Sequence, residues 1–180
     1  MNKVRTQIVC AIMLLAGLVS CEVTPIGPHT ADKGWDSVFV AGRIRCHGQY
    51  YPNIGCNVLS VDLLSRGLEF DSLDHISGKG VNLYLSDVFV PLGDSTLTSG
   101  IYTIDTTGTP YTIVPAVDFH PGLTGAYMVR FAGTAVTDTV MFADGEMTVT
   151  QWADSLMIEC AMRDARGGKY KAQCVMHHDR

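Results

Sequence analysis

Short runs of alternating apolar and polar residues recur along most of the chain. In a β-strand every second side chain points to the same face, so these runs predict strands that bury one face. The runs 59–63 and 81–85 carry Leu or Val at every second position. A third apolar face is predicted for Val38, Val40, Ile44 and Cys46.

About ten such segments follow one another between turn signals, and the sequence contains 18 glycines. Many short strands at this spacing are typical of an antiparallel β-sandwich or a small barrel. We therefore predict an all-β domain, an antiparallel β-sandwich with a small lipocalin-like β-barrel as the alternative. Asp144-Gly145 is predicted to be the turn of a hairpin. The predicted strand segments are 38–46, 59–63, 81–85, 101–104, 111–114, 127–131, 136–142, 147–152, 156–162 and 170–175.

The first twenty residues have the features of an export signal. Lys3 and Arg5 provide positive charge, and the uncharged run 8–19 is shorter than the roughly 20 residues of a membrane-spanning helix. The segment ends in Leu18-Val19-Ser20-Cys21, which resembles the lipobox of bacterial lipoproteins. This resemblance implies cleavage before Cys21 and acylation of its thiol, which would anchor the protein in a membrane. An ordinary secretory signal with a chance cysteine is the alternative.

Removing 20 of the 180 residues leaves 160, which is enough for one domain. We predict a signal peptide at 1–20, a flexible tether at 21–34, a β domain at 35–176 and a disordered tail at 177–180. Loss of two positive charges with the signal moves the formal charge from −5 to −7. An acidic chain without a basic run argues against nucleic acid as a partner, so the lipid is the expected contact with the membrane.

Four cysteines remain beyond the anchor, and an even number in an exported protein predicts two disulfides. A tight turn centred on Gly167 would set Cys160 opposite Cys174 on the buried face of two neighbouring strands. Cys46 and Cys56 would then close the loop between them, with about 3 kcal/mol of stabilisation in the chain-entropy model. Free buried thiols are the alternative.

Three segments carry a resemblance to a known group of proteins: Leu97–Ile104, Asp144–Val149 and Asp164–Tyr170. Together they resemble a β-sandwich module common in uncharacterised Bacteroidetes envelope lipoproteins, and the similarity covers roughly residues 80–175. The shared features are strand and turn signals. The resemblance implies a jelly-roll-like fold and an address in the cell envelope, and it implies no particular activity. We expect the outer membrane, on its periplasmic face or at the cell surface.

The sequence also contains six triplets in which Asp precedes Ser or Thr and a small or aliphatic residue follows. They resemble the acceptor used for O-glycosylation of exported proteins in the same phylum. Asp-Ser and Asp-Thr also start turns and strands, which is the alternative. Glycosylation would require exposed backbone, so we expect these residues at strand ends. The six predicted acceptors are Ser37, Ser72, Ser95, Thr106, Thr139 and Ser155.

The loop 47–55 contains two adjacent tyrosines, Tyr50 and Tyr51. Aromatic faces stack on sugar rings or on protein partners, and binding residues are common in loops on a rigid sheet. We predict a ligand-binding surface at these tyrosines, with Trp35 near it. The alternative is that the tyrosines fold back over the edge of the sheet. Trp152 could add to the binding surface, but packing inside the domain is the favoured prediction for it.

The sequence contains no nucleophile elbow, nucleotide-binding loop or zinc-protease motif. Asp118 and His120 offer a carboxylate and an imidazole, but the Pro121-Gly122 that follows indicates a turn. A zinc site built from the cysteines with His47 and His177-His178 is a minor alternative, because no Cys-x-x-Cys spacing occurs. No metal and no other cofactor is therefore expected.

These features favour a lipid-anchored, non-enzymatic binding or interaction domain with a glycan or an envelope protein as its partner. Two alternatives stay open. A structural accessory of a surface assembly or pilus would show an unpaired edge strand or an exchangeable terminal strand. A hydrolase acting on glycan or lipid would require a pocket lined by at least two carboxylates or histidines.

Overall fold

The computed structural model describes residues 36–119 and 122–177. Cys21, Trp35 and His120 lie outside the described residues, as do the predicted signal and nearly all of the predicted tether and tail. The described residues form twelve strands and no helix, which confirms the predicted all-β class. The strands are β1 (Asp36–Cys46), β2 (Cys56–Ser65), β3 (Leu68–Phe70), β4 (Ile76–Pro91), β5 (Gly100–Ile104), β6 (Thr112–Ile113), β7 (Val117–Phe119), β8 (Gly122–Thr124), β9 (Ala126–Gly133), β10 (Ala135–Gln151), β11 (Ser155–Asp164) and β12 (Lys169–His177).

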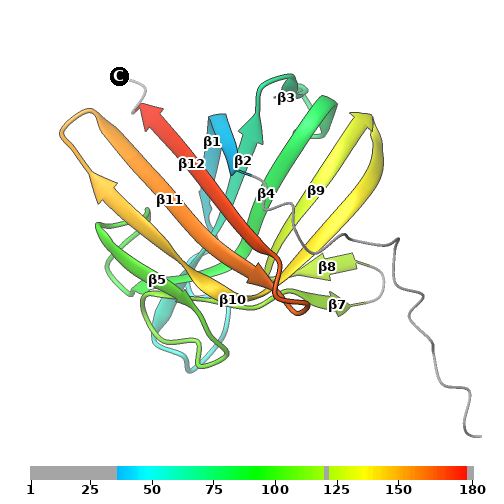
Figure 1. Cartoon of the computed structure of the whole chain (residues 1–180). Coiled ribbons are helices and arrows are strands. Elements are labelled where there is room, and N and C mark those ends of the chain that lie inside the picture. Colours follow the sequence, from blue (N-terminus) through cyan, green and yellow to red (C-terminus); the bar gives the residue numbers. More distant parts are fainter. Residues whose placement is uncertain (1–35, 120–121, 178–180) are drawn as a thin grey trace, which may run out of the picture.

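Seven strands pair edge to edge in the order β11, β12, β1, β2, β4, β9 and β10, and β10 pairs with β11 again. The pairings thus close into a ring, and Figure 1 shows the β11–β12 hairpin in front of β1, β2 and β4. Between β4 and β10, β9 fills one end of the sheet and β6 with β5 fills the other. The structure is sandwich-like, but its two layers belong to one sheet. Two pairs are parallel, β1–β12 and β5–β6, so the sheet is mixed and not purely antiparallel as predicted.

One hydrophobic core lies between the two layers. The predicted apolar faces of 59–63 and 81–85 are confirmed, because their Leu and Val side chains at every second position are at most 8% exposed. Met147 and Ile158 reach the same core from β10 and β11, where both are 0% exposed. Complete burial of each such side chain contributes about 1.5–3 kcal/mol, so this core is the main source of stability.

The face presented by β1 differs from the prediction. Phe39 is 2% exposed and packs in the core, whereas Val38 and Val40 are 71% and 51% exposed. The register between β1 and β2 shifts directly after Phe39, and Ile44 then packs on the core again. The predicted common face of these residues with Cys46 is therefore wrong, because a β-bulge exchanges the inward and outward positions.

The predicted hairpin turn at Asp144-Gly145 is also wrong. β10 continues through both residues, and its register with β11 shifts between Phe142 and Asp144. Gly145 has a φ of 132°, and a side chain there would collide with the carbonyl oxygen of Ala161. Ala143 is therefore the extra residue of a β-bulge, and Asp144 and Gly145 follow it as paired residues of one long strand. The chain reverses earlier, at Gly133-Thr134 between β9 and β10.

The predicted disulfides are absent, because all four cysteines of the described domain are free thiols. The β11–β12 hairpin has a register two residues away from the predicted one, so Cys160 faces Ala172 and Cys174 faces Ile158. The two cysteines share the buried face as expected, but only as diagonal neighbours. Diagonal neighbours have Cα atoms roughly 7–8 Å apart, which exceeds the usual span of a disulfide.

The second predicted disulfide fails for a similar reason. Cys46 faces Leu59, three residues along β2 from Cys56, which corresponds to about 10 Å at the rise of a strand. Cys46 is exposed, whereas Cys56, Cys160 and Cys174 are buried and are called the buried thiols below. Burial raises the pKa of all three buried thiols, to about 12 for Cys160 and about 11 for Cys174.

Candidate functional site

The outer face of β1, β2, β4 and β9 carries polar residues that are largely buried. The strand register sets Arg43, Asp62, Tyr84 and Tyr127 side by side across these four strands. Asp62 is only 5% exposed. Buried polar groups are stable when each finds a partner, so these contacts decide which groups remain able to bind a ligand.

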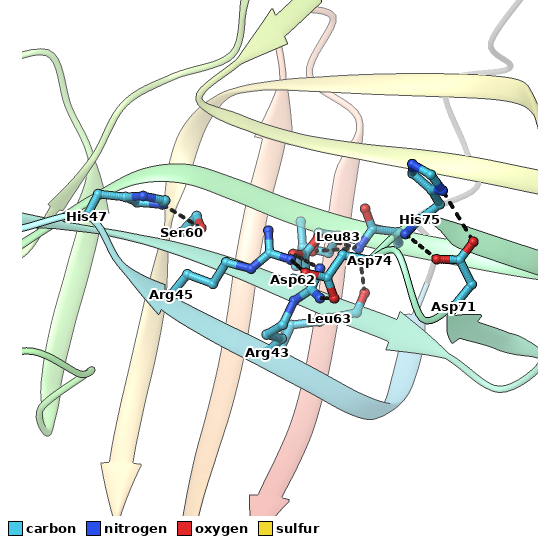
Figure 2. Close-up of polar contacts among 11 residues, drawn as sticks. Arg43, Arg45, His47, Ser60, Asp62, Leu63, Asp71, Asp74, His75 and Leu83 are labelled. Atoms are coloured by element: carbon cyan, nitrogen blue, oxygen red, sulfur yellow. Dashed lines mark hydrogen bonds and ion pairs between the residues drawn. The ribbon is translucent and has the colours of Figure 1, made fainter. Parts of the chain in front are cut away.

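The charged contacts around Asp62 are internal to the protein. Asp62 lies 3.5 Å from Arg43 Nη2, and Asn82 donates a 3.3 Å hydrogen bond to its carboxylate. Arg43 and Arg45 also pair with Asp74, from the loop that follows β3 (Figure 2). Burial raises the pKa of Asp62, although Asn82 and the two arginines act in the opposite direction. This cluster therefore has a structural role, because its charges neutralise one another.

His47 connects this cluster to a neighbouring pocket. Its Nε2 lies 3.0 Å from Ser60 Oγ, as Figure 2 shows. Ser60 also forms a hydrogen bond with Tyr84 and is only 2% exposed. The Ser60 hydroxyl is thus buried between His47 and Tyr84 and does not line the pocket. The exposed His47 lines it.

The pocket has a volume of about 250 Å³ and lies at the end of β1, over β2 and β4. We call it the Asp87 pocket. Its lining residues are His47, Tyr50, Tyr51, Val58, Ser86, Asp87 and Thr124. The pocket contains the two tyrosines predicted to bind a ligand and His47 from the same loop, together with polar residues from β4 and β8.

Asp87 is the charged group at the base of this pocket and is only 6% exposed. Tyr51 donates a 2.8 Å hydrogen bond to its Oδ1. Ser86 and Thr124 donate bonds of 2.6 and 2.9 Å to its Oδ2. Ser86 and Asp87 lie where the β2–β4 register shifts, and this bulge brings the carboxylate to the outer face of the sheet.

The two tyrosines have different environments. Tyr51 packs on Phe89 at a ring distance of 6.0 Å, and Tyr50 meets Tyr51 edge-on at 5.0 Å while remaining 65% exposed. Burial, and next the bond to Asp87, raise the pKa of Tyr51 to about 12, so its hydroxyl stays a donor. Tyr51 thus folds back over the sheet, as the alternative had it, whereas the Tyr50 ring is largely exposed, with the His47 ring at 6.4 Å.

Burial raises the pKa of two other tyrosines to about 12 as well, Tyr127 in β9 and Tyr170 in β12. Both lie outside the pocket, and the bond to Asp164 adds to the shift of Tyr170. Tyr51, Tyr127 and Tyr170 are called the three shifted tyrosines below. Each is neutral well above the pH at which an ordinary phenol ionises.

The loop that carries the tyrosines is held by backbone hydrogen bonds. The carbonyl oxygen of Gly48 accepts bonds of 2.9 Å from the N–H groups of Tyr50 and Val58. Gly48 has a φ of 62° and Gly55 a φ of 72°, a left-handed conformation that glycine adopts at little cost. Two glycines and the β1–β2 ladder therefore hold the loop in the absence of the predicted disulfide.

A larger depression of about 370 Å³ lies on the outer face of β10, β11 and β12. Its charged lining residues Glu146, Glu159 and Lys171 are all exposed to solvent. Among the described residues no buried charged side chain lines it, so water already satisfies its polar groups. The smaller Asp87 pocket is the better candidate because a buried carboxylate and an aromatic ring face the same space.

The predicted acceptor residues divide into two groups. Ser72, Ser95 and Thr106 are exposed in loops, as glycosylation would require. Ser155 is half-buried at the start of β11, and Thr139 is half-buried inside β10, where it faces Val129. The expectation of a strand end is therefore wrong for Thr139. Ser37 lies in β1 opposite Ala172, and its side chain is outside the described part of the chain.

Two further expectations concern Trp152 and Asp118. Trp152 is 48% exposed in the turn between β10 and β11, so the prediction that it packs inside the domain is wrong. Its backbone N–H donates a 2.8 Å hydrogen bond to the carbonyl oxygen of Ser155. Asp118 is exposed on β7, and its proposed partner His120 is outside the described residues.

The sequence analysis did not select Asp87, Ser86 or Thr124. A signal was present, since Ser86-Asp87 interrupts the apolar run from Leu83 to Val90. Within the described ranges, no three His, Cys, Asp or Glu side chains are placed to hold a metal ion. The same residues also contain no helix that is long and apolar enough to cross a membrane. No family model, no curated protein and no solved structure matches the chain.

Proposed function

We propose that the domain is a lipid-anchored binding module of the bacterial cell envelope, and that the Asp87 pocket holds a single sugar unit. The observation that carries the proposal is the combination of an exposed Tyr50 ring with the buried carboxylate of Asp87 in one pocket. A sugar ring offers an apolar face and several hydroxyl groups. The Tyr50 ring suits that apolar face, and Asp87, His47 and Thr124 offer hydrogen-bonding groups to the hydroxyls.

The size of the pocket supports a small ligand. Its volume of about 250 Å³ lies just below the roughly 300–1,000 Å³ of typical small-molecule sites. One sugar ring matches this volume better than an oligosaccharide, whose further units would extend into solvent. The arrangement favours binding over hydrolysis, because Ser60, the hydroxyl bonded to His47, is only 2% exposed.

The proposed location rests on the N-terminal sequence. Acylation of Cys21 would place the domain at the outer membrane, on the periplasmic face or at the cell surface. The formal charge of −7 after cleavage would not attract anionic lipid, so the acyl chains would provide the attachment. Metabolic labelling with palmitate tests this: wild type should incorporate label and Cys21→Ser should not. A mature N-terminus at any other residue contradicts the anchor.

A glycan array tests the binding function directly. Wild type should bind at least one sugar, and Tyr50→Ala should lose most of that signal because it removes the exposed ring. Trp152→Ala is the matched control, since it removes an aromatic ring of similar exposure, 48% against 65%, away from the pocket. Equal loss in both variants, or no sugar bound by wild type, would refute the proposal.

A further inference from the structure

The two buried carboxylates on the outer face of the sheet differ in how their charge is neutralised. Asp62, at 5% exposure, lies against the guanidinium of Arg43. Asp87, at 6% exposure, contacts three hydroxyl groups, from Tyr51, Ser86 and Thr124. Among the described residues, Asp87 has no Lys, Arg or His within ion-pair distance. One of the two charges is therefore paired and the other is not.

A buried carboxylate without a cation is costly, because hydroxyl donors stabilise the charge but do not cancel it. A carboxylate offers about four acceptor positions, and the three hydroxyls occupy three of them. Oδ1 accepts a bond from Tyr51 alone, so one of its positions remains open. Asp87 lines the pocket, so its carboxylate borders the space that a ligand would occupy.

The other groups at the pocket are compatible with a cation. The Tyr50 ring is 65% exposed, and an aromatic face attracts an ammonium group placed near it. Apart from Asp87 and the two tyrosines, His47 is the titratable side chain that lines the pocket, and its Nε2 lies within hydrogen-bond distance of Ser60. Val58 provides an apolar wall.

We propose that the sugar bound in the Asp87 pocket carries a free ammonium group, which pairs with Asp87 beside the Tyr50 ring. The inference rests on the proposed sugar-binding function and names the class of sugar: an amino sugar whose nitrogen is not acetylated. Arg43 provides a cation for Asp62 within the protein, and the ammonium of the ligand would provide the corresponding cation for Asp87. An N-acetylated sugar of the same shape lacks this charge and would leave the carboxylate unpaired.

Calorimetric titration of the purified full-length protein with glucosamine, N-acetylglucosamine and glucose tests the inference. We expect glucosamine to bind about tenfold more tightly than N-acetylglucosamine, because a charge-assisted hydrogen bond exceeds a neutral one by about that factor. Asp87→Asn should abolish this preference and retain binding of glucose. Glu159→Gln, which removes an exposed carboxylate on the other outer face, should keep the preference.

Each outcome separates the two proposals. If no sugar binds to wild type, the proposed function fails and the inference fails with it. If the three sugars bind equally, the function stands and the inference is overturned. Nα-acetyl-lysine amide, which keeps its side-chain ammonium, provides a fourth titration. If it binds as tightly as glucosamine, the ammonium is recognised without a sugar ring and the assignment to amino sugars is wrong. If Asp87→Asn does not fold, the wild-type preference measured at rising salt decides, since a salt-independent preference contradicts an ion pair.

Discussion

Replacing Tyr51 with Phe removes one hydroxyl group from the Asp87 pocket and keeps the ring that packs on Phe89. The lost bond is the 2.8 Å contact to Oδ1, and Asp87 is only 6% exposed. A hydrogen bond to a charged group contributes about 1.5–3 kcal/mol to the free energy of unfolding. Water in the open pocket can replace part of it, so we expect a loss near the lower end, about 1.5 kcal/mol. For a domain of this size, that corresponds to a fall in Tm of about 3–6 °C.

Urea unfolding followed by far-ultraviolet circular dichroism measures this change. Tyr50→Phe is the matched control, because its hydroxyl forms no hydrogen bond within the described residues and its ring is 65% exposed. We expect Tyr50→Phe to change the free energy of unfolding by less than about 0.5 kcal/mol. If the two variants agree within about 0.3 kcal/mol, the hydroxyl of Tyr51 does not stabilise Asp87 and the description of the pocket is wrong.

Three further predictions concern the rest of the domain. The pKa of each of the three shifted tyrosines is about 12 in the folded protein and about 10 in the unfolded chain. Their contribution to stability is therefore complete below about pH 10 and falls as the pH rises toward 12. Urea midpoints that stay constant over this range would contradict this prediction. In native protein, iodoacetamide should modify Cys46 rapidly and the buried thiols only after denaturation, and mass spectrometry showing equal labelling would refute their burial. Gly145→Ala should cost at least about 2 kcal/mol of the free energy of unfolding, whereas Gly93→Ala, where a side chain meets open space, should cost less than about 0.5 kcal/mol. Equal urea midpoints would contradict the close approach of Gly145 to the Ala161 backbone.

The strands could be predicted from the sequence because their apolar alternation is local information. The faces at 59–63 and 81–85 are buried as the alternation requires, and each of the ten predicted segments overlaps an observed strand. The errors lie at bulges and turns. One extra residue after Phe39 exchanges inside and outside, and Asp144-Gly145 carries a turn signal although pairing with Arg163 and Met162 of β11 keeps it in a strand. Such positions depend on the neighbouring strand, which a single segment does not encode.

The candidate site could be predicted only in part for the same reason. Tyr50 and Tyr51 stand out because two aromatics in a polar loop are a local signal. Asp87 and Thr124 are 37 residues apart and meet through the pairing of distant strands. The disulfide prediction shows the limit well, since a shift of two residues in one hairpin separates Cys160 from Cys174 although their shared buried face was predicted correctly.

The parallel pairing of β1 with β12 has a mechanical consequence. β1 is the first of the described strands, and it is bonded to β2 on one edge and to β12 on the other. A pull on the N-terminal end of β1, directed along its axis, would load the hydrogen bonds of both edges together in shear. In a terminal hairpin, by contrast, the bonds would open one at a time. A protein held to a moving surface by its N-terminus would thus resist extension at the point where the force enters.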